Sequence, residues 1–263
     1  MGGAIIRGYV AAAEKAGGKA DALFVYDSDS AKAATLAGSG LSVQKAESLG
    51  ELAEVCDALV LCVKPNIMDE VLETLAGLIK DEDKLIISIA AGISISYIQG
   101  KLGAKTNVVR VMPNTPAMVG EGMSALSASD GLSAADTGAV EKLFSAIGAA
   151  TWVPEEMMDI VTGISGSSPA YAYLYIEGLV RAGLAGGLSR EDATVLAAQS
   201  TLGAAKMVLE NLGEAEPQQL CENVCSPGGT TIEAVKVLEA EGFIETVSRA
   251  ANASAARSKT MTK

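Results

Sequence analysis

"DALVLCVKPNIMDEVLETLAGLI" (Asp57–Ile79) contains a strand, a turn and a helix in the order that is typical of α/β proteins. The apolar run Ala58–Val63 leads into Lys64-Pro65, and apolar residues then recur at helical spacing over Asp69–Ile79. The same alternation continues on both sides, with a helix-like segment at Ala134–Ile147 and apolar runs at Ala22–Asp27, Leu85–Ala90, Val108–Met112 and Ala150–Val153. Short apolar runs between helices indicate a parallel sheet that is covered on both faces. We therefore predict a doubly wound, mostly parallel α/β sheet.

The chain changes character beyond about Met157, where strand-like runs give way to long segments rich in Ala and Leu. We expect helices at Pro169–Ala185, Arg190–Asn211 and Thr231–Glu241, and a last helix that ends near Ser258. A length of 263 residues is enough for two domains. We predict an α/β domain over residues 1–154 and an all-helical domain over residues 155–263.

The overall charge limits the classes of partner. The chain carries a net charge of −12 and has a sequence pI near 4.6, whereas a nucleic-acid-binding protein would present a basic face. An acidic surface by itself mainly favours solubility. No apolar run has the length of a bilayer span, and no basic and apolar leader opens the sequence. We therefore expect neither a nucleic acid nor a membrane as partner.

The cysteines and the lack of histidine limit the kinds of metal site and of catalysis that this chain can support. The four cysteines form no CxxC pair, and the chain contains no histidine. We interpret Cys56, Cys62, Cys221 and Cys225 as buried, reduced thiols of a cytoplasmic protein, and we expect no metal site. The lack of histidine excludes Ser-His-Asp and Cys-His hydrolysis, as well as dehydrogenases whose acid is a His–carboxylate pair. Acid–base chemistry is left to other side chains or to water.

The first residues resemble part of a dinucleotide-binding motif. Met1–Gly18 has the apolar spacing of a helix that Gly17-Gly18 would end. Gly2 and Gly3 could form the end of a GxGxxG turn, and Asp27 has the position of the acidic residue that follows it. The rest of the motif is absent, and glycines at a helix start are common for purely structural reasons. On this motif alone the structural interpretation is the stronger one.

Two further turns favour a cofactor site. Lys64-Pro65 follows the apolar run of "LVLCVKP", and Ala90-Ala91-Gly92 follows that of "IISIAAG". Ligands of open α/β sheets bind beyond the carboxyl ends of the strands, where small residues leave the backbone accessible. The alternative is that both are ordinary strand-to-helix turns. Together with the opening helix, they favour the cofactor interpretation.

The second domain contains a glycine turn in front of a helix, "ENVCSPGGTTIEAV" (Glu222–Val235). The pattern predicts a capping box with Thr230 as N-cap and Glu233 at the third helical position. Gly228 and Gly229 would leave N–H groups uncovered at the positive end of the helix dipole, where a small carboxylate substrate could bind. A plain helix cap that needs glycine is an equally good explanation of this segment.

Longer segments resemble one enzyme family. These are "VTGISGSSPAYAY" (Val161–Tyr173), "LGAAKM" (Leu202–Met207) and "NVCSPGGTTIEAV" (Asn223–Val235), together with "VKP", "AAG" and "MPNTP" (Met112–Pro116). Over its whole length the chain resembles pyrroline-5-carboxylate reductases. The resemblance implies a Rossmann-type NAD(P)H-binding domain, a helical dimerisation domain and an active site between the two. It also implies the reduction of 1-pyrroline-5-carboxylate to L-proline, the last step of proline biosynthesis, in a homodimer that can assemble further.

The resemblance also assigns residues by their positions. Contact with the cofactor, NADPH or NADH, is implied for Gly2, Gly3, Ser28, Cys62, Val63, Lys64, Pro65, Ile89, Ala90 and Ala91. Substrate binding is implied for Asn223, Gly229, Thr230 and Thr231. The hydroxyl of Thr231 is implied to meet the ring nitrogen, which makes Thr231 the catalytic residue. Glu214 and Ser226 match neighbouring polar positions less closely.

The start of the chain departs from this family pattern. Members begin with a strand and a glycine turn that ends in a sequence like G-x-M-G-x-A-I, and Met1–Ile5 corresponds to the second half of that turn. We therefore expect an upstream segment of roughly ten residues that contains the strand and the leading glycines.

Alternatives remain for both activity and cofactor. A β-hydroxyacid dehydrogenase would use Lys206 as its acid–base group, but the asparagine expected four residues later is Glu210 here. A cofactor-binding protein without catalysis is a third possibility. Asp27 would repel a 2′-phosphate and favour NADH, whereas the resembling family often uses NADPH.

Overall fold

The computed structural model describes residues 1–18, 21–79 and 84–263. The chain divides into two compact units, one formed by Met1–Ser167 with Asn252–Lys263 and one formed by Ser168–Ala251. The sequence places a single boundary near Pro154, whereas the compact units divide at two points. Residues 155–167 and the end of the last helix both belong to the first unit, and the helical pattern of the sequence reveals neither assignment.

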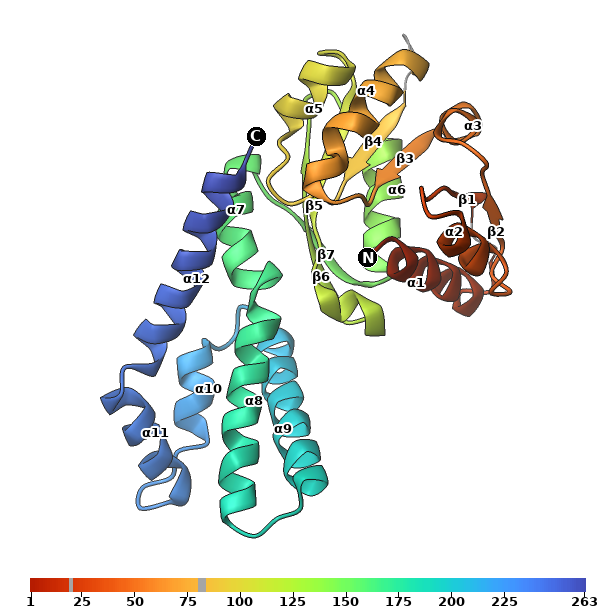
Figure 1. Cartoon of the computed structure of the whole chain (residues 1–263). Helices are drawn as coiled ribbons and strands as arrows, with labels where there is room; N and C mark the ends of the chain where they lie inside the picture. Colours follow the sequence, from red (N-terminus) through yellow and green to blue (C-terminus); the bar gives the residue numbers. More distant parts are fainter. Residues whose placement is uncertain (19–20, 80–83) are drawn as a thin grey trace. The chain divides into compact units, whose positions relative to one another are not determined.

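The first unit is built around a five-stranded sheet in the order β3-β4-β5-β6-β7 (Figure 1). All neighbouring strands are parallel except β5 and β6. Its strands are β3 (Ala58–Leu61), β4 (Leu85–Ser88), β5 (Asn107–Met112), β6 (Gly122–Ala128) and β7 (Gly148–Trp152). Four of the five predicted apolar runs are strands of this sheet, which confirms the mostly parallel arrangement. The sequence did not predict β6.

The fifth predicted run forms a separate sheet. β1 (Leu23–Val25) pairs in parallel with β2 (Val43–Lys45), and α2 (Ser30–Ala37) connects the two strands. The carboxylate of Asp29 accepts a hydrogen bond from the N–H of Ala31 and caps α2. The turn after β1 therefore lies at the carboxyl end of a two-stranded sheet.

Helices cover both faces of the five-stranded sheet. They are α1 (Gly2–Lys15), α3 (Leu49–Val55), α4 (Met68–Leu78), α5 (Ile95–Leu102) and α6 (Ala134–Ser145). Ile86 faces a core with Leu72 and Ile98, whereas its neighbour Ile87 faces a second core with Ile5 and Phe144. Figure 1 shows α4 and α5 on one side of the sheet and α6 on the other. The alternation along β4 accounts for the fully apolar run in the sequence.

Short connections complete the first unit. After β7 come the 3₁₀ turn Glu155–Met157, α7 (Met158–Val161) and a π-helical turn, Thr162–Gly166. Two further 3₁₀ turns are Pro65–Ile67, after β3, and Thr115–Val119, after β5.

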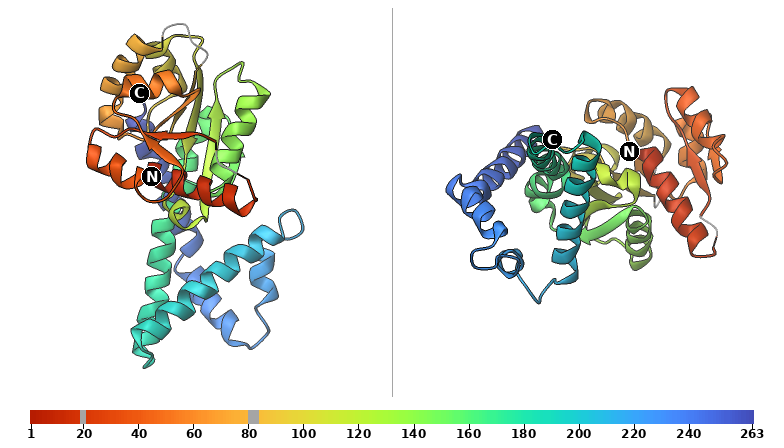
Figure 2. Two further views of the ribbon diagram at one scale, coloured as in Figure 1. Left: turned by 90° about the vertical axis from the view of Figure 1, so that its right-hand side faces the viewer. Right: turned by 90° about the horizontal axis from the view of Figure 1, so that it is seen from below.

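The second unit is helical. It contains α8 (Ser168–Ala185), α9 (Arg190–Glu210), α10 (Pro217–Asn223), α11 (Thr230–Ala240) and the first part of α12 (Phe243–Met261). In Figure 2, α8 and α9 diverge from the loop that joins them. Val180, Ala193 and Ala197 form a small buried cluster between α8 and α9. The long predicted helices are therefore confirmed.

Much apolar surface of the second unit is exposed. Exposed side chains on α8 and α9 include Tyr173, Leu174, Val195, Leu196, Leu202, Met207 and Leu209. The most exposed of these residues, Leu174, has 75% of its surface accessible to solvent. In the part of the chain that the structure describes, no helix is long and apolar enough to cross a bilayer.

Candidate active site

Two of the predicted cofactor turns lie side by side at the carboxyl end of the five-stranded sheet. The last residues of β3 and β4, Leu61 and Ser88, are paired, and the N–H of Ile89 donates to the carbonyl of Leu61 over 3.2 Å. Cys62–Pro65 and Ile89–Ala91 therefore leave the sheet as neighbours. The Ser88 hydroxyl accepts from the N–H of Ala90 over 3.4 Å, which shapes the second turn. This is the edge at which ligands of open α/β sheets bind.

The first turn of α1 joins this group. A Cβ added at Gly2 would lie 3.2 Å from the Sγ of Cys62, so a larger residue at position 2 would have to displace the thiol. Cys62 is exposed as a whole residue, yet its thiol group is desolvated beside α1, and this burial raises its pKa to about 11. Gly2 and Gly3 therefore lie at a helix start next to the turn after β3.

Ser28 is placed apart from these turns. It is exposed in the loop between β1 and α2, at the end of the separate two-stranded sheet. The carboxylate of Asp27 accepts the N–H of Asp29 over 2.9 Å, so this carboxylate helps to form the local turn. No hydrogen bond within residues 1–18, 21–79 and 84–263 joins Ser28 to the turns after β3 and β4.

The substrate loop of the second unit lies between α10 and α11. Asn223 ends α10, and its side-chain oxygen accepts a hydrogen bond from Gln219 over 3.2 Å. Gly228 has a positive φ of 71°, and a Cβ at Gly229 would lie 2.4 Å from the Oγ of Ser226. The loop therefore requires both glycines for its backbone path.

The predicted capping box is wrong. The N-cap of α11 is Gly229 with no side-chain cap, and Thr230 is already helical. Glu233 pairs with Lys236 over 2.7 Å and does not reach back to the helix start. The prediction that Gly229 exposes a free N–H is also wrong, because this N–H donates to the carbonyl of Ser226 over 3.0 Å. A glycine N-cap supplies no side-chain acceptor for the helix.

The side-chain hydroxyls of Thr230 and Thr231 are available to bind a ligand. Both are exposed in the first turn of α11, and no hydrogen bond of the described chain occupies either hydroxyl. The first turn of a helix also leaves N–H groups without partners inside the helix. Hydroxyls and N–H groups thus stand together at the positive end of the α11 dipole, a combination that suits a small carboxylate.

Comparisons with known proteins identify the family. The family model described as pyrroline-5-carboxylate reductase dimerisation matches residues 155–261, and the one described as NADP oxidoreductase, coenzyme F420-dependent, matches residues 1–92. The pyrroline-5-carboxylate reductase of Escherichia coli K12 is 41% identical over 243 residues, which are 92% of this chain and 88% of that protein. The chain belongs to the pyrroline-5-carboxylate reductase family.

Solved structures of the reductase family have the same fold. The enzyme of Plasmodium falciparum with NADP bound is 35% identical with a TM-score of 0.85, and the match covers 100% of this chain and 95% of that one. The enzyme of Coxiella burnetii is 32% identical with a TM-score of 0.88 and coverages of 100% and 96%. These reductases confirm a Rossmann-type domain followed by a helical one.

Asn114, in the motif "MPNTP", has a structural role that the sequence pattern does not predict. Its side chain donates to the carbonyl of Ser165 in the π-helical turn over 3.0 Å and accepts from the N–H of Met123 over 2.9 Å. A Cβ at Gly166 would lie 2.6 Å from the Cε of Met112. Asn114 and Gly166 therefore fix the turn that precedes α8. The signal available in the sequence was an asparagine within the segment bounded by Pro113 and Pro116.

The thiols differ from their expectation. All four cysteines are free, but Cys62 and Cys221 are exposed as residues and Cys56 and Cys225 are half-buried. The prediction of four buried cysteines is therefore wrong, although the thiol group of Cys62 itself is desolvated beside α1. In the described parts of the chain, no three His, Cys, Asp or Glu side chains gather as metal ligands. Lys206, the group of the dehydrogenase alternative, is exposed on α9.

Proposed function

We propose that this chain reduces 1-pyrroline-5-carboxylate to L-proline with NAD(P)H. The observation that carries the proposal is the 41% identity to the Escherichia coli reductase over 92% of the chain. The NADP bound to the related Plasmodium enzyme and the NADP oxidoreductase model over residues 1–92 support the cofactor class. The reaction completes proline biosynthesis.

The turns after β3 and β4 fit a dinucleotide. The side chains of Ala90 and Ala91 are small, a Cβ at Gly2 would lie only 3.2 Å from the Sγ of Cys62, and Lys64 supplies an exposed positive charge. The residues proposed to hold the cofactor are Gly2, Gly3, Ser28, Cys62, Val63, Lys64, Pro65, Ile89, Ala90 and Ala91. When bound, the reduced nicotinamide supplies a hydride to the imine carbon. The protein contributes orientation, because a protonated imine accepts hydride readily.

The start of α11 is proposed to bind the substrate. The free hydroxyl of Thr231 accepts the N–H of the protonated imine and thereby fixes the plane of the ring. The helix start at Gly229 and Thr230 binds the carboxylate through its dipole and through the N–H groups of the first helical turn, which begins at Thr230. Asn223 borders the loop on its other side. Thr231 is the catalytic residue in this proposal, because its hydroxyl touches the reacting group.

The helical part is proposed to form a homodimer. The dimerisation model over residues 155–261 supports this, as do the exposed apolar side chains of α8 and α9. The functional division then lies at 154/155, with cofactor binding in residues 1–154 and substrate binding and dimerisation in residues 155–263. Sedimentation at micromolar concentration tests the dimer, and a monomer would contradict it. The free thiols and the biosynthetic relatives favour the cytoplasm as location.

A turnover assay tests the proposed activity. Purified protein is mixed with 1-pyrroline-5-carboxylate and either NADPH or NADH, and the loss of absorbance of the reduced cofactor is followed. Proline formation with at least one cofactor supports the proposal, and the ratio of initial rates identifies the preferred one. Oxidation of a 3-hydroxy acid without reduction of the imine would instead support the dehydrogenase alternative. Cofactor binding without turnover of either substrate would support a binding protein.

A further inference from the structure

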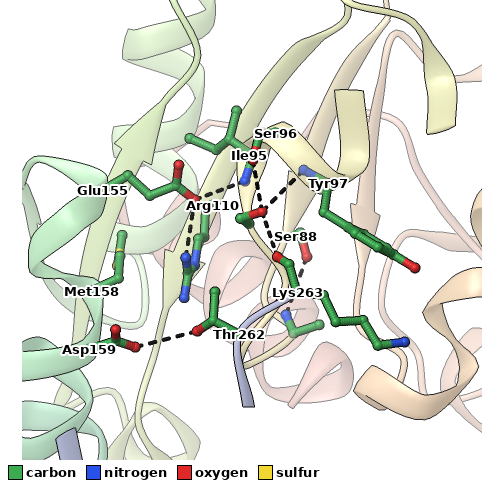
Figure 3. Close-up of polar contacts among 12 residues, drawn as sticks. Ser88, Ile95, Ser96, Tyr97, Arg110, Glu155, Met158, Asp159, Thr262 and Lys263 are labelled. Carbon is green, nitrogen blue, oxygen red and sulfur yellow. Dashed lines mark hydrogen bonds and ion pairs between the residues drawn. The ribbon is translucent and has the colours of Figure 1, made fainter. Parts of the chain in front are cut away.

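Lys263 adds its backbone to the turn after β4. Its N–H donates to the carbonyl of Gly92 over 2.8 Å, and its carbonyl accepts from the N–H and the hydroxyl of Ser94 over 3.3 and 2.6 Å. Figure 3 shows Lys263 at the start of α5, the helix that begins at Ile95 directly after Ser94. Lys263 therefore holds the segment that directly follows Ile89–Ala91.

The side chain of Lys263 reaches a different element. Its ammonium lies 2.9 Å from the Oδ2 of Asp69 and 5.6 Å from the ring centre of Tyr97. Asp69 stands in the first turn of α4, four residues after Pro65, and it also accepts a hydrogen bond from the hydroxyl of Tyr97. These partners lower the pKa of Asp69, so its carboxylate is charged at neutral pH. One residue thus contacts the segments that follow both cofactor turns.

The backbone at Gly92 leaves space for the end of α12 to approach the turn after β4. Gly92 has a positive φ of 73°, and a Cβ there would lie 2.8 Å from the carbonyl oxygen of Met261. The end of α12 is further held by the hydroxyl of Ser258, which donates to the carboxylate of Asp159 over 2.7 Å. A side chain at position 92 would push the end of α12 away. The close packing indicates that the position of Lys263 is fixed by its surroundings.

We propose that Lys263 is a positioning residue that holds the two cofactor turns in register, binding Gly92 and Ser94 through its backbone and Asp69 through its ammonium. This inference rests on the proposed function, because it assumes that the two turns bind NAD(P)H. A preformed pair of turns loses less conformational freedom when the cofactor binds. Loosening the pair therefore weakens cofactor binding and leaves the hydride-transfer step itself largely unchanged.

The test compares direct binding of NADPH, by the fluorescence of the reduced nicotinamide, in the chain of 263 residues and its variants. Lys263→Met removes the ammonium and keeps the backbone contacts, and we expect a Kd raised about twofold to fivefold. Asp69→Asn should raise the Kd by a similar factor, and Lys263→Arg should restore wild-type binding. Lys259→Met, an exposed lysine in the last turn of α12 and four residues before Lys263, is the matched control and should leave the Kd unchanged. The KM for the imine and kcat at saturating NADPH should stay within about twofold of wild type in all variants.

The result distinguishes this inference from the proposed function. Binding of NADPH is measured without turnover, so a wild type that binds NADPH but reduces no imine contradicts only the proposed function. Wild-type Kd values in both Lys263→Met and Asp69→Asn would overturn the positioning role. So would an equal loss in Lys263→Met and Lys259→Met, or a loss of kcat with an unchanged Kd.

Discussion

The guanidinium of Arg110 lies 3.1 Å from the carboxylate of Glu155, and the same carboxylate oxygen accepts the N–H of Ile95 over 2.8 Å. Arg110 is in the middle of the sheet on β5 and its side chain is only 8% exposed. Glu155 directly follows Pro154, and Ile95 is the first residue of α5 (Figure 3). One carboxylate thus ties the sheet, the helix after the second cofactor turn and the segment after β7 together.

We predict that Glu155→Leu lowers the free energy of unfolding by about 3 kcal/mol, because it leaves the guanidinium of Arg110 buried without a counter-charge. Replacing both partners, as Arg110→Met with Glu155→Leu, should cost distinctly less than the single change, since no unpaired charge remains. Urea titrations of the three proteins give the comparison. A double variant that is less stable than Glu155→Leu would show that the ion pair is not the source of the loss.

Gly148 and Gly138 form a second matched pair for stability. Gly148 has a φ of 143°, and a Cβ there would lie 1.9 Å from the carbonyl oxygen of its cross-strand partner Gly122. Gly148→Ala should therefore destabilise the protein by about 3 kcal/mol. Gly138 lies exposed within α6, and a Cβ added there would meet no atom within 4 Å outside its own helix backbone, so Gly138→Ala should stabilise the protein by about 0.5–1 kcal/mol. Thermal unfolding of both variants is the measurement, and equal melting temperatures would contradict the prediction.

The parallel part of the fold could be predicted because its strands are buried on both faces. Leu85–Ser88 is buried at every residue and therefore appears as an unbroken apolar run. β6 could not be found in this way, since "GMSALSA" contains small and polar residues such as Ser124 and Ser127 that are buried between its neighbours. β2 has only three residues, too few for a periodic pattern.

The sequence predicted which turns belong to the candidate site, but it did not predict the long-range contacts between them. The positions of Lys64-Pro65 and Ala90-Ala91 after apolar runs locate the edge of the sheet on which they lie. The contacts of Lys263 with Gly92 and Asp69 join residues far apart in the chain, and no local pattern reports such a contact. The prediction of a capping box was wrong because α11 begins one residue earlier than the motif suggests. Gly229 is the N-cap and Thr230 is already helical, and a motif alone does not fix a helix start to one residue.

We predict an unusual pH dependence for alkylation of Cys62. Burial beside α1 raises the pKa of its thiol from the ordinary value of 9.0 to about 11, so the reactive thiolate is scarce at pH 8 in the folded protein. The rate of reaction with iodoacetamide should keep rising about tenfold per pH unit through pH 9.5. Mass spectrometry of the labelled peptide measures the rate, and the chain unfolded in urea serves as control, with a midpoint near 9.0. A folded-state midpoint at the unfolded value would contradict the prediction.

Lys206 should be dispensable for turnover. It is exposed on α9, in keeping with a solvated helix lysine. We expect Lys206→Met to keep kcat/KM for 1-pyrroline-5-carboxylate within about threefold of wild type, because no step of the proposed mechanism uses an amine. Circular dichroism checks that the fold is intact. Loss of nearly all turnover in a folded variant would favour the dehydrogenase alternative, in which this lysine is the acid–base group.

Thr231 offers the most direct test of the proposed substrate site. Its hydroxyl is exposed in the first turn of α11 and is proposed to hold the protonated imine nitrogen. A hydrogen bond to a charged group contributes about 1.5–3 kcal/mol, so Thr231→Val, which keeps the shape and removes the hydroxyl, should lower kcat/KM about tenfold to a hundredfold. Thr231→Ser retains the hydroxyl and should recover most of the activity. NADPH binding and the melting temperature should change little in either variant, because the side chain is exposed. Equal kcat/KM values for the valine variant and the wild type would remove Thr231 from the mechanism. The main contact with the substrate would then be the one between its carboxylate and the start of α11.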